Sequence, residues 1–249
     1  RFLRREIEAT ELYRRNFVIY DTSDSQAVIK DCLKKLNLDE KQYAPNNILH
    51  AISNAKNQLQ GPHTFKKLAD GFFQEKVAEV YELYAQRLRE SNALDFDDLL
   101  MVSVRLLEEQ EDIRQKYQRR FQYILVDEYQ DTNGVQEAIL SLVQNPARRN
   151  LFAVGDVKQS IYRFRLADPS LFLQKYQHYP KLGEGYVRVD LAQNFRSRPE
   201  ILSAINFLFA QVMVPGTMEL CYDEAAALHP GPDYPPATGP TLAGPVELR

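Results

Sequence analysis

Apolar residues recur at helical spacing through the first ninety positions of the chain. Ser23 and Gln26 fit a capping box at the start of the first amphipathic segment, and Gly61-Pro62 follows the second. The aromatic residues of the third segment are predicted to pack in a core. The three predicted helices carry the stripes Val28, Ile29, Cys32, Leu33 and Leu36; Ile48, Leu49, Ile52, Ala55 and Leu59; and Phe72, Phe73, Val77, Val80, Tyr81, Tyr84 and Leu88.

The pattern changes after Asn92, where short apolar runs alternate with helical segments. Asp95 stands near the start of one predicted helix, and Pro199 suits the first turn of another. Strands separated by helices favour an α/β fold with a parallel sheet. The chain from His229 onward is dense in Pro and Gly and is predicted to be a loop or linker. The predicted helices span 96–107, 135–143 and 199–212, and the predicted strands span 121–126, 151–154 and 187–191.

Composition narrows the class of protein without identifying a function. The 249 residues are 44% hydrophobic and 26% charged, enough for one large domain or two small ones. No apolar run is long enough to cross a membrane, and the charged amino end does not resemble a signal peptide. Cys32 and Cys221 match no metal spacing, so we expect free thiols in a reducing cytosol. The net charge of −3 does not indicate a nucleic-acid ligand. A local basic groove would nevertheless be enough to bind nucleic acid.

The segment Ile124–Asp131 is the most informative in the chain. An apolar run, predicted to be a strand buried on both faces, ends abruptly in Asp127 and Glu128, with Asp131 close behind. The carboxyl end of a parallel strand is where such a fold presents charge to a ligand. In a nucleotide-hydrolysing site Asp127 would hold a magnesium ion and Glu128 would face the attacking water. The alternative is an acidic helix start, which favours the helix dipole.

Two further segments follow predicted strands. In the first, Gly155 permits a close backbone approach, and Gln159 supplies a neutral donor and acceptor. In the second, Arg196 follows a strand end as an arginine finger for a γ-phosphate would. Each has a structural alternative: Gln159 could satisfy a turn, and Arg196 could pair with a surface carboxylate. Between them stand aromatic residues alternating with arginines, an arrangement typical of single-stranded nucleic-acid tracks, although Phe164 could also be core: Tyr162, Arg163, Phe164 and Arg165.

Together these segments resemble motifs II, III and IV of the UvrD/Rep/PcrA-like superfamily 1 DNA helicases. The matching segments are Asp127–Asp131, Gly155–Tyr162 and Gln193–Ser197, and Leu94–Leu100 resembles the short aspartate-containing segment ahead of motif II. Other segments are closer to AddA, the branch of the ATP-dependent helicase/nucleases, than to UvrD. These are Val157–Pro169, Phe2–Glu6 and Tyr222–Ala226.

The resemblance implies a role for each matching residue. Asp127 would bind Mg²⁺, Glu128 would activate water, and Gln159 would sense the γ-phosphate of ATP. Arg196 would stabilise charge on the transferred phosphoryl group. The aromatic side chains of Tyr162 and Phe164 would stack on DNA bases, with Arg163 and Arg165 beside them contacting the strand or supporting the aromatic pair.

The resemblance also implies a domain organisation. It predicts a partial P-loop NTPase (RecA-like) parallel sheet preceded by a helical subdomain that touches duplex DNA. Residues 1–93 would form that 1B-like subdomain, 94–198 the RecA-like 1A portion, and 199–249 the start of the second motor domain with its linker. No Gly-x-x-x-x-Gly-Lys-Ser/Thr phosphate loop occurs among the 249 residues. We therefore expect an internal piece of a longer protein that is inactive by itself.

For the parent protein the resemblance implies an ATP-dependent 3′-to-5′ DNA helicase that acts in double-strand break repair and recombination. It would use ATP and Mg²⁺, bind single-stranded and duplex DNA, and work in the bacterial cytoplasm at the nucleoid. A nuclease like AddB would be its partner. Two other classes stay open. One is a DNA-binding scaffold without hydrolysis, and the other is a metal-dependent nuclease using Asp127, Glu128 and Asp131.

Overall fold

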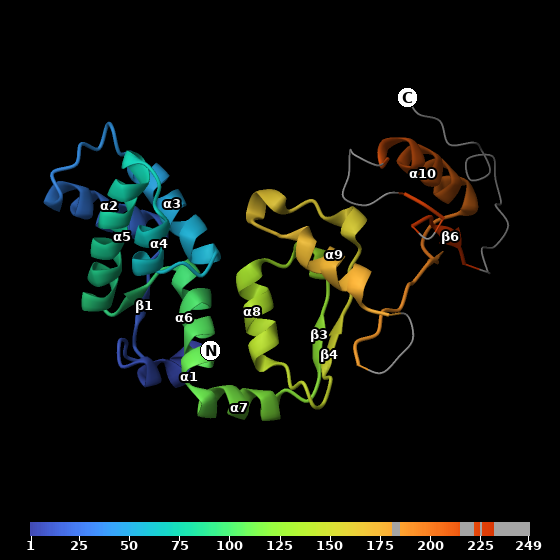
Figure 1. Cartoon of the computed structure of the whole chain (residues 1–249), viewed down its shortest axis with the longest axis horizontal. Coiled ribbons are helices and arrows are strands. Elements are labelled where there is room, and N and C mark those ends of the chain that lie inside the picture. The colour runs from blue at the N-terminus through green and yellow to red at the C-terminus, as the bar shows by residue number, and fades with distance from the viewer. Residues whose placement is uncertain (181–184, 215–221, 225, 232–249) are drawn as a thin grey trace. The chain divides into compact units, whose positions relative to one another are not determined.

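The structure is a computed structural model that describes residues 1–180, 185–214, 222–224 and 226–231 (Figure 1). The chain divides into two compact units, Arg1–Lys175 and Tyr176–Arg249. The predicted three-part organisation into 1–93, 94–198 and 199–249 stays a prediction.

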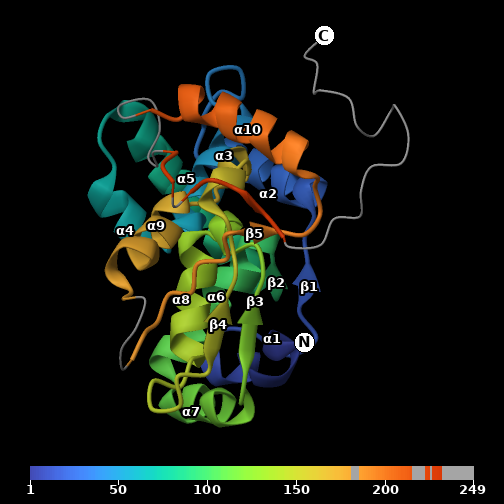
Figure 2. The ribbon, with the colours of Figure 1, turned by 90° about the vertical axis from the view of Figure 1, so that its right-hand side faces the viewer.

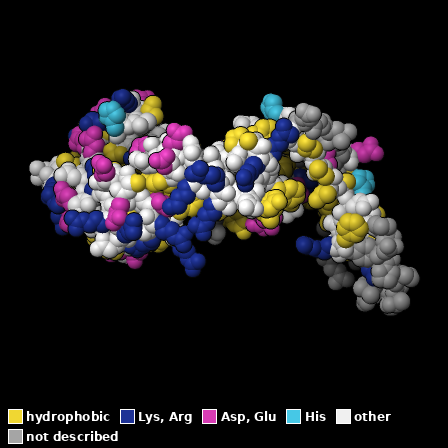
Figure 3. All heavy atoms as spheres, turned by 90° about the horizontal axis from the view of Figure 1, so that it is seen from below, with side chains coloured by type: hydrophobic (Ala, Val, Ile, Leu, Met, Phe, Trp, Pro, Cys, Tyr) yellow, Lys and Arg dark blue, Asp and Glu magenta, His cyan; other side chains and the backbone are white. Residues whose placement is uncertain are grey.

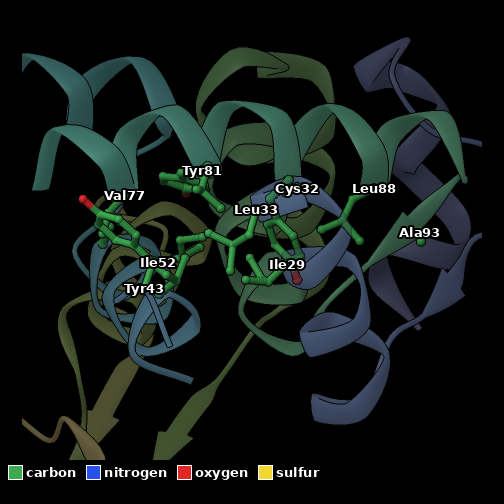
Figure 4. Close-up of a cluster of buried hydrophobic side chains, with 13 residues drawn as sticks. Ile29, Cys32, Leu33, Tyr43, Ile52, Val77, Tyr81, Leu88 and Ala93 are labelled. Atoms are coloured by element: carbon green, nitrogen blue, oxygen red, sulfur yellow. The ribbon is translucent and has the colours of Figure 1, made fainter. Parts of the chain in front are cut away.

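The first part of unit 1 is helical, as the apolar stripes predict. The middle of each stripe is buried in one cluster, in which the side chains of Ile29, Ile52 and Tyr81 pack together (Figure 4). Burying such side chains is worth about 1.5–3 kcal/mol each relative to exposure, so this cluster is the main source of stability here. The elements are α1 (Phe2–Glu6), a 3₁₀ turn (Ile7–Thr10), α2 (Thr22–Lys35), α3 (Pro45–Asn57), α4 (Pro62–Leu68) and α5 (Phe72–Glu90).

Two details of this helical part differ from prediction. The capping box of α2 is formed by Asp21 and Asp24 rather than by Ser23 and Gln26, because the helix begins at Thr22, two residues earlier than a cap at Ser23 would place it. The predicted core position of Phe72 and Phe73 is wrong, since these side chains are 65% and 43% exposed. Both lie in the first turn of α5, which precedes the first residue of this helix that is buried in the cluster.

The remainder of unit 1 alternates helices with short parallel strands. Helix α6 begins at the predicted cap, where Asp95 accepts a hydrogen bond from the backbone N–H of Asp98. Strand β3 pairs in parallel with β4, with Val126 opposite Ala153 (Figure 2). The elements are β1 (Val18–Ile19) paired with β2 (Ala93–Leu94), α6 (Phe96–Glu109), α7 (Glu111–Arg120), β3 (Ile124–Val126), α8 (Gly134–Val143), β4 (Leu151–Ala153) and α9 (Pro169–His178), whose last residues from Tyr176 belong to unit 2, with 3₁₀ turns at Tyr129–Asp131, Val157–Gln159 and Arg163–Arg165.

Strand β3 is not buried on both faces, which corrects the sequence-based prediction. Ile124 packs toward α8 and α7, whereas Leu125 is 77% exposed. Successive side chains of a strand point to opposite faces, and the register places Leu125 beside Phe152, which is 60% exposed. In the described residues the sheet has two strands with helices packed on one face, so its other face is open. The pairing is also shorter than predicted, at three residues in each strand.

Unit 2 contains α10 (Pro199–Val212) and a parallel pair formed by β5 (Gln193–Asn194) and β6 (His229–Pro230). Pro199 occupies the first turn of α10, as predicted. The predicted strand at 187–191 is wrong, because the strand lies at Gln193–Asn194 instead. Its pairing with β6 starts with the hydrogen bond from His229 N–H to Ala192 O. The predicted loop at His229 is a strand instead. Pro230 is tolerated there because the N–H groups of its neighbours make the ladder bonds. The chain from residue 232 lies outside the described part.

A buried ion cluster joins α3 to α6. The Nζ atom of Lys56 lies 2.6 Å from Asp95 Oδ2 and 2.7 Å from Asp98 Oδ1, and Tyr84 OH donates to Asp95 Oδ2 at 2.9 Å. Burial raises the pKa of Asp98 to about 6, whereas Lys56 outweighs the effect of burial on Asp95 and lowers its pKa. Burial would lower the pKa of Lys56, but the two carboxylates hold it above its usual value. The cluster therefore keeps one cation between two carboxyl groups inside the protein.

No helix in the described part of the chain is both long enough and apolar enough to span a membrane.

Candidate functional site

The acidic pair Asp127 and Glu128 lies at the carboxyl end of β3, and both side chains are exposed. The backbone turns sharply there, because Glu128 adopts φ 52°, in the left-handed region that is unfavourable for a residue with a Cβ. Asp127 Oδ1 accepts a hydrogen bond from Glu128 N–H at 2.9 Å. Tyr129 N–H donates to Val154 O at 2.9 Å, which anchors the turn on β4. The surrounding structure thus holds the carboxylates at a strained turn, a feature that clusters at functional sites.

A pocket of about 430 Å³ opens beside this turn, between the end of β3 and α8. Asp127, Glu128 and Asp131 line it. The Oδ1 atom of Asp131 is buried and makes no hydrogen bond to the described residues. Magnesium is usually held by one or two carboxylates together with nucleotide phosphates and water, so this donor set fits a Mg²⁺–nucleotide. Asp127, and Asp131 behind it, are the residues that would hold the ion there.

The loop after β4 meets the loop after β3 at the same edge of the sheet. Gln130, which is buried, accepts a hydrogen bond through Oε1 from Asp156 N–H at 3.0 Å, and Ser160 Oγ donates to Gln130 O at 3.4 Å. A Cβ on Gly155 would lie 2.6 Å from Gln130 Oε1, 2.9 Å from the ring of Phe172 and 3.2 Å from the backbone N of Gln130, so this close approach favours glycine. Gln159, which is exposed, donates through Nε2 to Asp156 Oδ2 at 3.1 Å. The structure therefore brings the loops of Glu128 and Gln159 together.

The aromatic pair follows directly on this second loop. The rings of Tyr162 and Phe164 lie 5.9 Å apart at 46°, and Phe164 is 76% exposed, which argues against a core role for it. Arg163 is also exposed. The side chain of Arg165 lies outside the described part of the structure. The base-stacking roles of the pair stay predictions.

Arg196 belongs to unit 2, where its side chain is exposed. The turn that carries it is organised by Asn194, whose Oδ1 accepts hydrogen bonds from Arg196 N–H and Ser197 N–H, both at 2.9 Å. The convergence of Arg196 on Glu128 and Gln159 therefore stays a prediction.

Two buried polar residues of unit 1 were not singled out from the sequence. Gln130 joins the two loops, and its only sequence signal is its place between the acidic pair and Asp131. Lys56 had a clearer signal: it stands four residues after Ile52, on the apolar face of its helix, where an unpaired lysine would be costly.

The nuclease interpretation requires several metal ligands close together. Across the part of the chain that the structure describes, no group of three or more His, Cys, Asp or Glu side chains is placed to hold a metal ion. The carboxylates Asp127, Glu128 and Asp131 therefore form no such cluster, and a two-metal site gains no support from their arrangement.

Comparisons with known proteins agree with the motif assignment. Residues 1–180 match the family model of the UvrD/REP helicase N-terminal domain. The chain is 45% identical over 208 residues to ATP-dependent DNA helicase PcrA of Bacillus subtilis, a match that covers 83% of this chain and 27% of that protein. It is 48% identical over 176 residues to a subunit of the ATP-dependent helicase/nuclease of Listeria welshimeri, which covers 68% of this chain and 13% of that protein. The chain thus spans only a minor part of these relatives. Because the family model covers most of its length, the chain belongs to the UvrD/REP helicase N-terminal domain family.

Proposed function

We propose that this chain is part of the motor of an ATP-dependent DNA helicase. One observation carries the proposal: the carboxylate turn after β3 and the loop after β4 are joined through Gln130, and the second loop leads directly into the exposed aromatic pair. A movement of the loop that faces the nucleotide would therefore be transmitted to the residues that face DNA through only a few intervening residues. Phosphoryl transfer relies on positioning and electrostatics, which such a rigid pair of loops supplies.

Within this proposal each site residue has a task. Asp127 holds Mg²⁺, which supplies charge neutralisation for the phosphates when it is bound. Glu128 orients and deprotonates the attacking water, and Gln159 reads the state of the γ-phosphate. Arg196 places a guanidinium against the transferred group, and the sheet that carries Asp127, Glu128 and Gln159 is part of a RecA-like fold. Tyr162 and Phe164 stack on bases while Arg163 and Arg165 contact the strand.

The wider proposal rests on the resemblance to superfamily 1 DNA helicases, and the relatives' names add only the ATP-dependent helicase activity. The complete protein would move 3′ to 5′ along single-stranded DNA in the bacterial cytoplasm, in double-strand break repair, with an AddB-like nuclease as its partner. A phosphate loop outside these 249 residues would complete its ATP site, since no Gly-Lys phosphate loop occurs within them.

The test is DNA-stimulated ATP hydrolysis. The complete protein is expected to hydrolyse ATP faster when single-stranded DNA is added and to unwind a duplex with a 3′ overhang. Residues 1–249 alone are expected to show no turnover, because the phosphate-binding loop is not among them. DNA-stimulated turnover by residues 1–249 would contradict the proposed division of the ATP site, and absence of turnover in the complete protein would contradict the helicase function.

Base stacking has its own test. Replacing Phe164 by alanine is expected to weaken binding of single-stranded DNA by about 1–3 kcal/mol, the usual contribution of one aromatic platform. The measurement is fluorescence anisotropy with a labelled oligonucleotide. The control is Phe72→Ala, which removes another exposed aromatic ring, in the first turn of α5. Equal affinities for the Phe164 variant and the wild type would exclude the stacking role.

A further inference from the structure

The amino-terminal edge of the β3–β4 sheet carries a second charged surface that the proposed function does not use. Because the two strands are parallel, their amino ends share one edge, opposite the carboxyl edge with its acidic turn. Helix α7 ends in Arg119 and Arg120 just before β3, and the loop before β4 contains Arg148 and Arg149. We call these four arginines the basic edge. Seen from the side on which α7 lies, Lys and Arg side chains gather on the surface (Figure 3).

A buried asparagine holds the two halves of the basic edge together. Asn150, which is 7% exposed, donates through Nδ2 to Phe121 O at 2.6 Å and accepts at Oδ1 from Asn145 N–H at 2.9 Å. Its own carbonyl accepts from Ile124 N–H at 2.8 Å. These bonds fix the chain after Arg120 against the loop that carries Arg148 and Arg149.

The arginine loop is also fixed internally. The N–H groups of Arg148 and Arg149 both donate to Asn145 O at 3.1 Å, and Arg149 adopts φ 50°, in the left-handed region. The surroundings therefore hold these residues in a defined conformation at some cost in backbone energy. A preorganised loop loses less entropy when it binds a ligand.

The four guanidinium groups are available for a ligand. All four side chains are exposed, and within the described residues none of them forms an ion pair, in contrast to Lys116 on the same helix, which pairs with Glu6 at 2.7 Å. Tyr123, 82% exposed, adds an aromatic ring and a hydroxyl at the same edge. Like charges that share one edge without counter-charges repel one another, so a bound polyanion would stabilise this arrangement.

We propose that the basic edge binds the phosphate backbone of duplex DNA, as a contact separate from the carboxyl edge of the sheet. Arginine presents a planar fork that matches phosphate geometry. Interfaces with DNA are much more positively charged than interfaces between proteins, so four arginines without counter-charges at one edge favour DNA over an acidic protein. The contact would be independent of sequence, because phosphates carry no base information.

The test compares a charge-neutralising variant of the complete protein with a charge-retaining variant at the same four positions, both without nucleotide. The first carries Arg119→Gln, Arg120→Gln, Arg148→Gln and Arg149→Asn, where Asn suits the positive φ. The second, the lysine variant, carries Arg119→Lys, Arg120→Lys, Arg148→Lys and Arg149→Lys, which keeps a positive charge at each of the same four positions. Binding of a labelled duplex is measured over a range of salt concentrations, with thermal unfolding as the control for folding.

Each phosphate contact contributes about 0.9 to the slope of log affinity against log salt, so the basic-edge variant is expected to lose about 3–4 from the slope. The lysine variant should keep the wild-type slope. Unchanged slope in the basic-edge variant, or an equal loss in both variants, would overturn the proposal. If only binding of a poly-glutamate peptide is lost, the ligand is an acidic protein and not DNA. The measurement does not depend on ATP turnover, so its failure is distinguishable from failure of the proposed helicase function.

Discussion

Replacing Glu128 by glutamine in the complete protein is expected to slow ATP turnover by about 10²–10⁴-fold while DNA binding is retained. Glutamine keeps the size of the side chain and its position at the turn after β3 but cannot accept the proton of the attacking water. General-base catalysis typically contributes a factor of this size. The measurement is the steady-state rate of phosphate release with saturating single-stranded DNA, together with DNA affinity in the same buffer.

A matched variant separates a role in chemistry from a general effect of lost charge. Glu109→Gln makes the same substitution at an exposed position at the end of α6 and should leave turnover unchanged. The result also decides between classes of function. A nuclease would lose DNA cleavage in the Glu128 variant, and a non-hydrolysing scaffold would show no turnover in any variant. Undiminished ATP turnover in the Glu128 variant would remove that residue from the proposed mechanism.

The helical part of the fold was predictable because its signal is local. The stripe of Ile48, Ile52 and Ala55 repeats at helical spacing, and all three residues are buried as the period requires. The same holds for α6, where the cap at Asp95 and the apolar positions agree. The order of motifs likewise allowed the family to be recognised, which the family model confirms.

The failures of prediction came where pairing between distant segments decides the structure. Leu125 and Phe152 are apolar in sequence, but their exposure depends on which strands and helices lie beside them. The strand at Gln193–Asn194 exists because His229 N–H donates to Ala192 O and Gly231 N–H donates to Asn194 O. Its own composition gives no strand signal. Such short strands are fixed only by the strands that pair with them, and no short stretch of sequence contains both members of a pair.

The candidate site was predictable in its residue types and only partly in its geometry. The sequence placed Asp127, Glu128 and Gln159 at strand ends, and the structure joins their loops at one edge. The link itself depends on the buried side chain of Gln130 and the close approach of Gly155, which are tertiary features. Hydrogen bonds of this kind follow from the fold and not from local spacing, so they could not have been inferred beforehand.

Replacing Lys56 by methionine is expected to lower the free energy of unfolding by about 3–5 kcal/mol, the usual cost of breaking a buried ion pair by removing one partner. Methionine fills a similar volume, so the loss comes from charge and not from a cavity. Without the ammonium group, Asp95 and Asp98 face each other inside the protein with no counter-charge. The measurement is urea unfolding followed by circular dichroism.

The same substitution at an exposed pair supplies the control. Lys66 lies 3.1 Å from Glu82 with half of its side chain exposed, and Lys66→Met is expected to cost about 0–1 kcal/mol. Adding Asp98→Asn to the Lys56 variant should recover part of the loss, because it removes one of the two uncompensated carboxylates. Asp98 is the partner to neutralise, since burial already raises its pKa to about 6 in the intact cluster. If Lys56→Met costs no more than Lys66→Met, the buried cluster does not hold α3 against α6, and the apolar contacts between these helices must do so alone.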